Sequence, residues 1–116
     1  MLNWEEAPAV YLFTHPVDMR SGFDRLVELA KSELGRSPLR GGLFVFVSRN
    51  RRRTKILFWE KDGFWLLYKR LEAGVFHVDF CDGHEELSGV DLKLLLEGVE
   101  LSRIRLRKEV DKGLYD

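Results

Sequence analysis

Apolar residues fall into short runs along the chain, and the spacing within these runs changes from strand-like to helix-like. Ala9–Phe13 is apolar and aromatic and is followed by Thr14-His15-Pro16, which predicts a short strand. Between Ser21 and Gly35, apolar side chains recur every three or four positions, at Phe23, Leu26, Val27, Ala30 and Leu34. This spacing predicts an amphipathic helix. We expect Ser21 to cap its start and Gly35 to end it.

A series of apolar runs with short connections then predicts an antiparallel meander. The runs are Leu43–Val47, Lys55–Glu60, Phe64–Leu71 and Val75–Phe80. Lys61-Asp62-Gly63 is a strong signal for a tight hairpin turn. In the second run, Ile56 and Phe58 share one face while Leu57 and Trp59 share the other. Both faces of the predicted sheet therefore need an apolar cover.

A second helix is predicted from Ser88 to Gly98, since Ser88 and Asp91 form a capping pattern ahead of a leucine-rich stretch. One helix on each face would cover the sheet. The fold class predicted is α+β, with a twisted antiparallel sheet of four to five strands and two short helices. We expect one domain over residues 1–102. Residues 103–116 are expected to form a basic tail or an edge strand, because Arg103–Lys108 alternates basic and apolar residues.

The chain has 116 residues and one cysteine, Cys81, so an internal disulfide is excluded. Its apolar runs are far shorter than the ~18 residues of a membrane span, and the acidic N-terminus lacks the basic start of a secretory signal. These features predict a cytoplasmic protein that does not enter a membrane.

Charge is segregated although the net charge is zero. Residues 36–70 carry ten basic and two acidic side chains, and residues 71–102 carry one basic and eight acidic. The basic block includes Arg49-Asn50-Arg51-Arg52-Arg53-Thr54-Lys55, which connects two predicted strands. A cationic loop on a rigid sheet suits a polyanion such as DNA, although such charges also keep sheet edges soluble. The predicted DNA-binding residues are Arg20, Arg49, Arg51, Arg52, Arg53, Lys55, Lys69 and Arg70, with Trp59, Trp65 and Tyr68 as candidate stacking groups.

The acidic block and the tail suggest a protein partner instead. We expect Glu85 and Glu86 to meet a basic surface, and Ile104 and Leu106 to dock on a partner. A homodimer through an uncovered sheet edge is a further alternative. The oppositely charged blocks either form separate faces or fold against each other.

Catalytic motifs are not evident. The acidic residues between Asp79 and Asp91 lie in one contiguous segment that is typical of a solvated loop, and no nucleophile motif or phosphate-binding glycine loop is present. His77, Cys81 and His84 are metal-ligand types, but their spacing differs from that of usual structural zinc sites. We therefore predict a non-enzymatic protein without a metal or another cofactor.

Three stretches resemble a known family. They are Pro16–Asp24, Gly42–Phe46 and Lys55–Glu72, and Leu94–Gly98 resembles the ending of the same proteins. The family is TnpB, the second-reading-frame accessory protein of bacterial insertion sequences of the IS66 type, and the resemblance covers about residues 9–100. It implies a role in transposition beside a separate transposase, which makes the DNA of the element ends and that transposase the expected partners.

Overall fold

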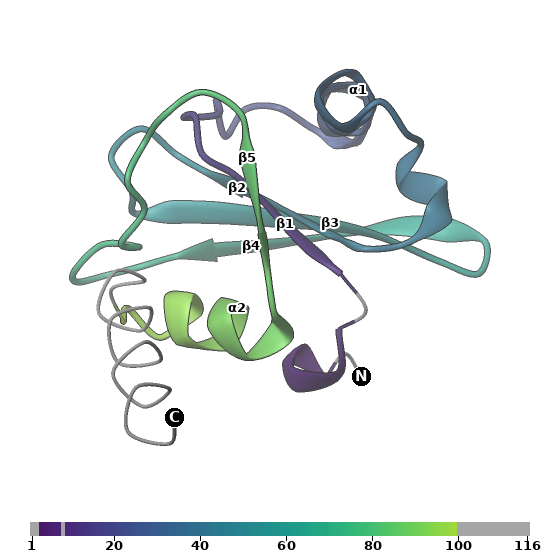
Figure 1. The fold of residues 1–116 in the computed structure, drawn as a ribbon. Coiled ribbons are helices and arrows are strands. Elements are labelled where there is room, and N and C mark those ends of the chain that lie inside the picture. Colours follow the sequence, from purple (N-terminus) through teal and green to yellow (C-terminus); the bar gives the residue numbers. More distant parts are fainter. Residues whose placement is uncertain (1–2, 8, 100–116) are drawn as a thin grey trace, which may run out of the picture.

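The computed structural model describes residues 3–7 and 9–99, which form a five-stranded sheet with one helix on each face (Figure 1). The strands are β1 (Val10–Phe13), β2 (Leu43–Val47), β3 (Arg53–Glu60), β4 (Gly63–Arg70) and β5 (His84–Leu87). The helices are α1 (Phe23–Leu34) and α2 (Gly89–Leu96), with the short 3-10 helices η1 (Trp4–Glu6) and η2 (Pro38–Arg40). This architecture confirms the predicted α+β class with a twisted sheet and two short helices.

The sheet is mixed rather than purely antiparallel. Its order is β4-β3-β2-β1-β5, and β1 runs parallel to β2 while the other neighbours are antiparallel. A parallel pair needs a crossover connection, and α1 lies within the one that joins β1 to β2. Only β2, β3 and β4 form the predicted meander, so the expectation of an entirely antiparallel sheet is wrong.

The last strand differs from the predicted one. Val75–Phe80 is an irregular segment, although Phe76 and Val78 are buried in the core and the Phe76 N–H donates to the Arg51 carbonyl at 2.7 Å. The edge strand is β5 instead, in the acidic stretch expected to be a loop. Its pairing with β1 places Glu85 opposite Leu12 and Glu86 opposite Tyr11.

Two apolar cores lie on opposite faces of the sheet. The core beneath α1 includes Phe13, Val17, Leu26, Ala30, Phe44, Phe46 and Leu57. The core beneath α2 includes Val10, Leu12, Val45, Val47, Ile56, Phe76, Val78, Leu92 and Leu95. Every residue of β2 is buried, because this strand has neighbours on both edges and a helix over each face. The predicted double cover is therefore confirmed.

The helix ends follow the sequence signals with one exception. The Gly35 N–H donates to the Lys31 carbonyl with φ 67°, and the Ser88 hydroxyl accepts from the Asp91 N–H at 3.0 Å, as expected. Ser21, however, does not cap α1, whose N-cap residue is Gly22 and has no side-chain cap. The Ser21 carbonyl instead accepts a hydrogen bond from the Lys55 ammonium at 2.7 Å.

Candidate nucleic-acid interface

The loop between β2 and β3 is braced by its own small polar side chains. The Ser48 hydroxyl donates to Asn50 Oδ1 at 2.8 Å and accepts from the Arg53 N–H at 3.0 Å. Asn50 Oδ1 also accepts from the Arg52 N–H at 3.0 Å. These bonds fix the backbone without using the arginine side chains, so the charged groups project from a defined loop.

A groove of about 670 Å³ separates this loop from the segment that follows β1. The Val17 N–H donates to the Val47 carbonyl at 2.9 Å and so holds that segment against β2. The groove residues are Pro16, Val17, Asp18, Met19, Ser48, Arg49, Asn50 and Arg53. Its lining therefore combines the apolar side chains of the segment after β1 with the exposed side chains of Arg49 and Arg53.

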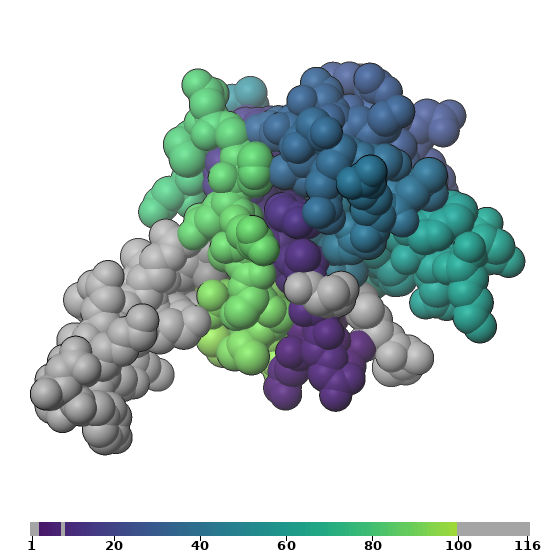
Figure 2. Space-filling model, turned by 45° about the vertical axis from the view of Figure 1, so that its right-hand side comes forward, coloured from purple at the N-terminus to yellow at the C-terminus, as the bar shows by residue number. Residues whose placement is uncertain are grey.

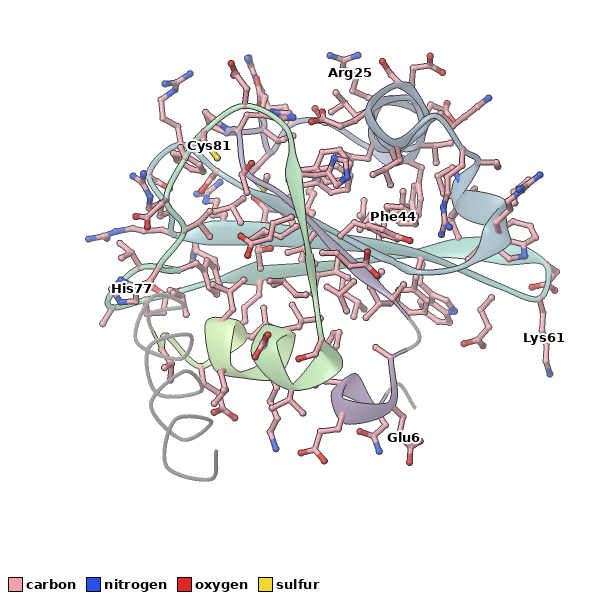
Figure 3. The ribbon with its side chains drawn as sticks, in the orientation of Figure 1. Glu6, Arg25, Phe44, Lys61, His77 and Cys81 are labelled. Atoms are coloured by element: carbon pink, nitrogen blue, oxygen red, sulfur yellow. The ribbon has the colours of Figure 1, made fainter. Side chains whose placement is uncertain are left out.

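A second hollow of about 430 Å³ adjoins the groove through Arg53 and is completed by Tyr68, Arg70 and Glu72. Arg53 and Arg70 are directly opposite each other in the β3–β4 pairing. The Arg53 guanidinium donates to the Tyr68 hydroxyl at 3.2 Å, and Arg70 pairs with Glu72 at 2.9 Å. We term Arg49, Arg52, Arg53 and Arg70 the basic rim. By the strand pairing, these residues lie at the end of the β3–β4 hairpin opposite to its turn, and Figure 3 labels Lys61 in that turn.

Three of the predicted DNA-binding residues make contacts inside the protein. Arg51 Nε donates to the Val78 carbonyl at 2.8 Å, and its guanidinium lies 4.0 Å from the centre of the Phe80 ring. Lys55 is buried, with its ammonium on the Ser21 carbonyl. Lys69 donates to the Leu96 carbonyl at 3.2 Å, at the end of α2. These contacts inside the protein occupy donors of the three cations, and their assignment to a DNA surface stays a prediction.

Arg20 lies beside the groove in an exposed ion pair with Asp18, with 2.6 Å between Nη2 and Oδ2. Hydrogen bonds from the Arg20 side chain and backbone lower the pKa of Asp18 to about 2. Asp18 is a groove residue, so this pair neutralises a carboxylate that would otherwise repel an anion.

Of the three candidate stacking aromatics, Tyr68 lies next to the basic rim and is half exposed. Trp59 packs edge-on against Phe64 with 5.0 Å between ring centres, near the hairpin tip. Trp65 is 55% exposed, but it points to the α2 face, since it alternates along β4 with Leu66 of the α1 core. The two tryptophans are therefore not part of the groove.

The two predicted partner-binding glutamates do not share one face of the sheet. Glu85 and Glu86 are consecutive in a strand and so face opposite sides of the sheet. Ile104 and Leu106 lie outside the described residues. Within the described part of the chain, His77, Cys81 and His84 belong to no group of three or more His, Cys, Asp or Glu side chains able to hold a metal ion.

Sequence reasoning missed the groove lining and the loop braces. Pro16, Val17 and Met19 appeared to belong to a turn, and nothing local indicated that Val17 pairs with the end of β2. The usable signal was Ser48-Arg49-Asn50, because Ser and Asn directly after a strand commonly close loops through side-chain hydrogen bonds.

Fold and groove together define a small α+β protein with a basic rim at one end of its sheet, and in the described residues no helix is long and apolar enough to cross a membrane. The family described as IS66 Orf2 like protein matches residues 8–106, so the chain belongs to that family of insertion-sequence accessory proteins. The resemblance in the sequence is thereby confirmed. The match spans a few more residues than the resemblance did and reaches the start of the basic tail.

Two relatives come from Sinorhizobium fredii (strain NBRC 101917 / NGR234). The uncharacterized protein y4jC is 34% identical over 104 residues, which cover 89% of this chain and 88% of that protein. The uncharacterized protein y4hO is 34% identical over 92 residues, which cover 78% of this chain and 80% of that protein. No solved structure matches the chain.

Proposed function

We propose that this accessory protein binds DNA through the basic rim and the adjoining groove, and that it assists a separate transposase without itself cutting DNA. The element ends are the DNA on which transposition acts, so they are the expected target. The family membership supports a role in transposition, and the geometry of the rim supports contact with phosphates.

The observation that carries the proposal is the Arg53–Arg70 pair. Two like charges directly opposite each other on neighbouring strands destabilise a sheet. Arg70 has Glu72 as a partner, but among the described residues Arg53 has no carboxylate within ion-pair distance. A bound phosphate would relieve this repulsion, and arginine binds phosphate through parallel N–H donors.

The surroundings of Arg53 fit the same ligand. Arg49 and Arg52 are exposed and, within the described residues, neither makes an ion pair or a side-chain hydrogen bond. Their backbone is already fixed by Ser48 and Asn50, so binding would order side chains but not the loop. The apolar side chains of the groove lining offer contact to sugar or base beside the charged ones.

The salt dependence of binding to element-end DNA tests this proposal. The variant Arg49→Ala/Arg52→Ala/Arg53→Ala removes three cations of the basic rim. If each contacts one phosphate, the slope of log K against log salt should become shallower by about 2.7. The control Lys31→Ala/Arg40→Ala/Lys61→Ala removes the same charge from exposed residues of α1, η2 and the hairpin tip, and it should leave the slope within about 0.5 of the parent.

Equal slopes for the two variants would overturn the proposal, since net charge alone would then explain the effect. A protein-interaction module that binds the transposase without DNA is the alternative. It predicts co-purification with the transposase that survives nuclease treatment, together with no DNA binding by either the parent or the rim variant.

A further inference from the structure

We propose that two copies of this chain pair through the free edges of their β4 strands, so that their two sheets become one continuous antiparallel sheet. This inference goes beyond the proposed function and does not depend on DNA binding. It follows from the shape of the edge, the positions of its free backbone groups and the charges at its two ends.

The two edges of the sheet differ sharply. β5 has four residues and carries two glutamates, which is how natural proteins protect an edge from pairing. β4 has eight residues, contains no proline, and pairs with β3 in an unbroken register from Gly63 to Arg70. No described strand covers its outer side. The β3–β4 hairpin also stands out from the body of the molecule, as the teal region of Figure 2 shows.

The ladder determines which β4 residues can accept a partner. The Leu71 N–H donates to the Arg52 carbonyl, so residues at odd positions of β4 direct their backbone groups toward β3. The alternate residues then direct their N–H and C=O groups outward, and these residues are Phe64, Leu66, Tyr68 and Arg70. They offer a complete row of donors and acceptors.

A two-fold axis through Leu66 pairs the outward-directed residues of β4 with the same residues of the partner's β4. Leu66 then pairs with the partner's Leu66, and Phe64 pairs with the partner's Tyr68, so every outward group meets another outward group. Asp62, in the hairpin turn, falls opposite the partner's Arg70, and by symmetry the same ion pair forms again at the other end. Hydrogen bonding and charge therefore select the same register.

The side chains fit this register as well. Trp65 falls opposite the partner's Leu67, on the α2 face of the joined sheet. Trp65 is 55% exposed in the single chain, which is unusual for so large an apolar group, and pairing would cover it. Aromatic and aliphatic residues that face each other across strands stabilise the pair.

Such a dimer would arrange two basic rims on one face, a consequence that does rest on the proposed function. The axis is perpendicular to the sheet, so both α1 faces point the same way. The strand rise and spacing place Arg53 about 30 Å from the partner's Arg53. This separation is close to one turn of B-DNA, about 34 Å, and would let both rims contact one side of a duplex.

The test is the oligomeric state of the full chain without DNA, measured by light scattering after size exclusion from about 1 to 200 µM. We expect a concentration-dependent mass that approaches about 27 kDa, twice the 13.6 kDa of the chain. Asp62→Arg and Arg70→Asp should each weaken the dimer about tenfold or more, because each places two like-charged pairs in the interface. The double variant Asp62→Arg/Arg70→Asp should restore the affinity of the parent.

Glu86→Arg on β5 is the matched control and should leave the dimer unchanged. A mass of 13.6 kDa at every concentration would overturn the proposal. Disruption by Glu86→Arg, or failure of the double variant to recover, would also overturn it. Because this experiment contains no DNA, a negative result would overturn the dimer and not the proposed DNA binding. A negative result in the DNA-binding experiment would likewise leave the dimer untouched.

Discussion

At the scale of single residues, the basic run between β2 and β3 separates into two kinds of cation. Arg49 and Arg52 are exposed and without a described side-chain partner, whereas Arg51 and Lys55 donate to the Val78 and Ser21 carbonyls. The difference follows from where the backbone directs each side chain. Lys55 lies inside β3, where side chains point at a covered face, and Arg51 has φ 60°, which turns it toward the irregular segment after β4.

Arg51→Ala should lower the free energy of unfolding by about 2 kcal/mol. The substitution removes a charge-assisted hydrogen bond to Val78 and a cation–π contact with Phe80. Urea unfolding monitored by circular dichroism measures the change. Arg52→Ala removes the same charge from an exposed neighbour and should stay within about 0.5 kcal/mol of the parent. If both variants lost the same stability, Arg51 would have no special structural role.

At the scale of elements, α2 and η1 meet too closely for a side chain at the first residue of α2. A Cβ on Gly89 would overlap the Trp4 carbonyl oxygen. The ion pair between Lys93 and Glu5, at 3.0 Å, joins the same two elements. Gly89 therefore allows η1 to pack against the start of α2 and against the core beneath that helix.

Gly89→Ala should displace η1 and cost about 1–3 kcal/mol of unfolding free energy, since the obstructing atoms belong to the backbone and cannot rotate away. Urea unfolding gives the cost, and hydrogen exchange of η1 shows the displacement. Gly63→Ala is the matched control, because a Cβ there meets nothing within 4 Å. A Gly89→Ala variant as stable as the control would contradict the close contact.

Sequence patterns predicted those elements whose signals are local. α1, the runs of β2 to β4, and the Ser88 cap of α2 agree with the expectation because periodicity and capping depend only on nearby residues. β5 was missed because its short stretch His84–Leu87 is mostly polar and becomes a strand only through pairing with β1. Val75–Phe80 was predicted as a strand because it is apolar, but its buried residues, Phe76 and Val78, lie in a segment without strand pairing.

The candidate site was predictable to the same extent. The proximity of Arg70 to the loop followed from a two-residue hairpin connection, and the structure confirms it. The sequence did not indicate which cations have partners inside the protein, because the partners of Lys69 and Arg51 are 27 residues away in sequence. Contacts between distant segments also create the groove, through Val17 and Val47.

At the scale of the whole molecule, the strand order separates the basic strand β4 from the acidic strand β5. β4, which ends in the basic rim, and β5, which carries Glu85 and Glu86, are the two opposite edges of one sheet. The two blocks also meet: Arg70 pairs with Glu72, and Arg51 donates to the Val78 carbonyl and lies over the Phe80 ring, whereas β2 and β1 lie between β3 and β5. The acidic strand β5 is therefore remote from the basic rim, although the segment that follows β4 contacts the same loop.

The basic tail, residues 103–116, lies outside the described residues. The buried apolar residues of the described chain fall between Val10 and Leu96, and they belong to the sheet, the two helices and the segments that join them. From the predicted domain boundary at residue 102, we expect truncation after Ser102 to change the free energy of unfolding by less than about 1 kcal/mol. It removes Ile104 and Leu106, which are apolar residues of the type that docks on a protein partner, and leaves the basic rim intact.

We accordingly expect truncation to weaken co-purification with the transposase more than it weakens DNA binding by the isolated protein. Urea unfolding, DNA binding at two salt concentrations and nuclease-treated pull-down together measure the three effects. The variant Ile104→Ser/Leu106→Ser keeps every charge of the tail and should reproduce the pull-down defect alone, because only the apolar contacts are lost. A large loss of fold stability on truncation would instead assign the tail to the domain and move its boundary beyond residue 102.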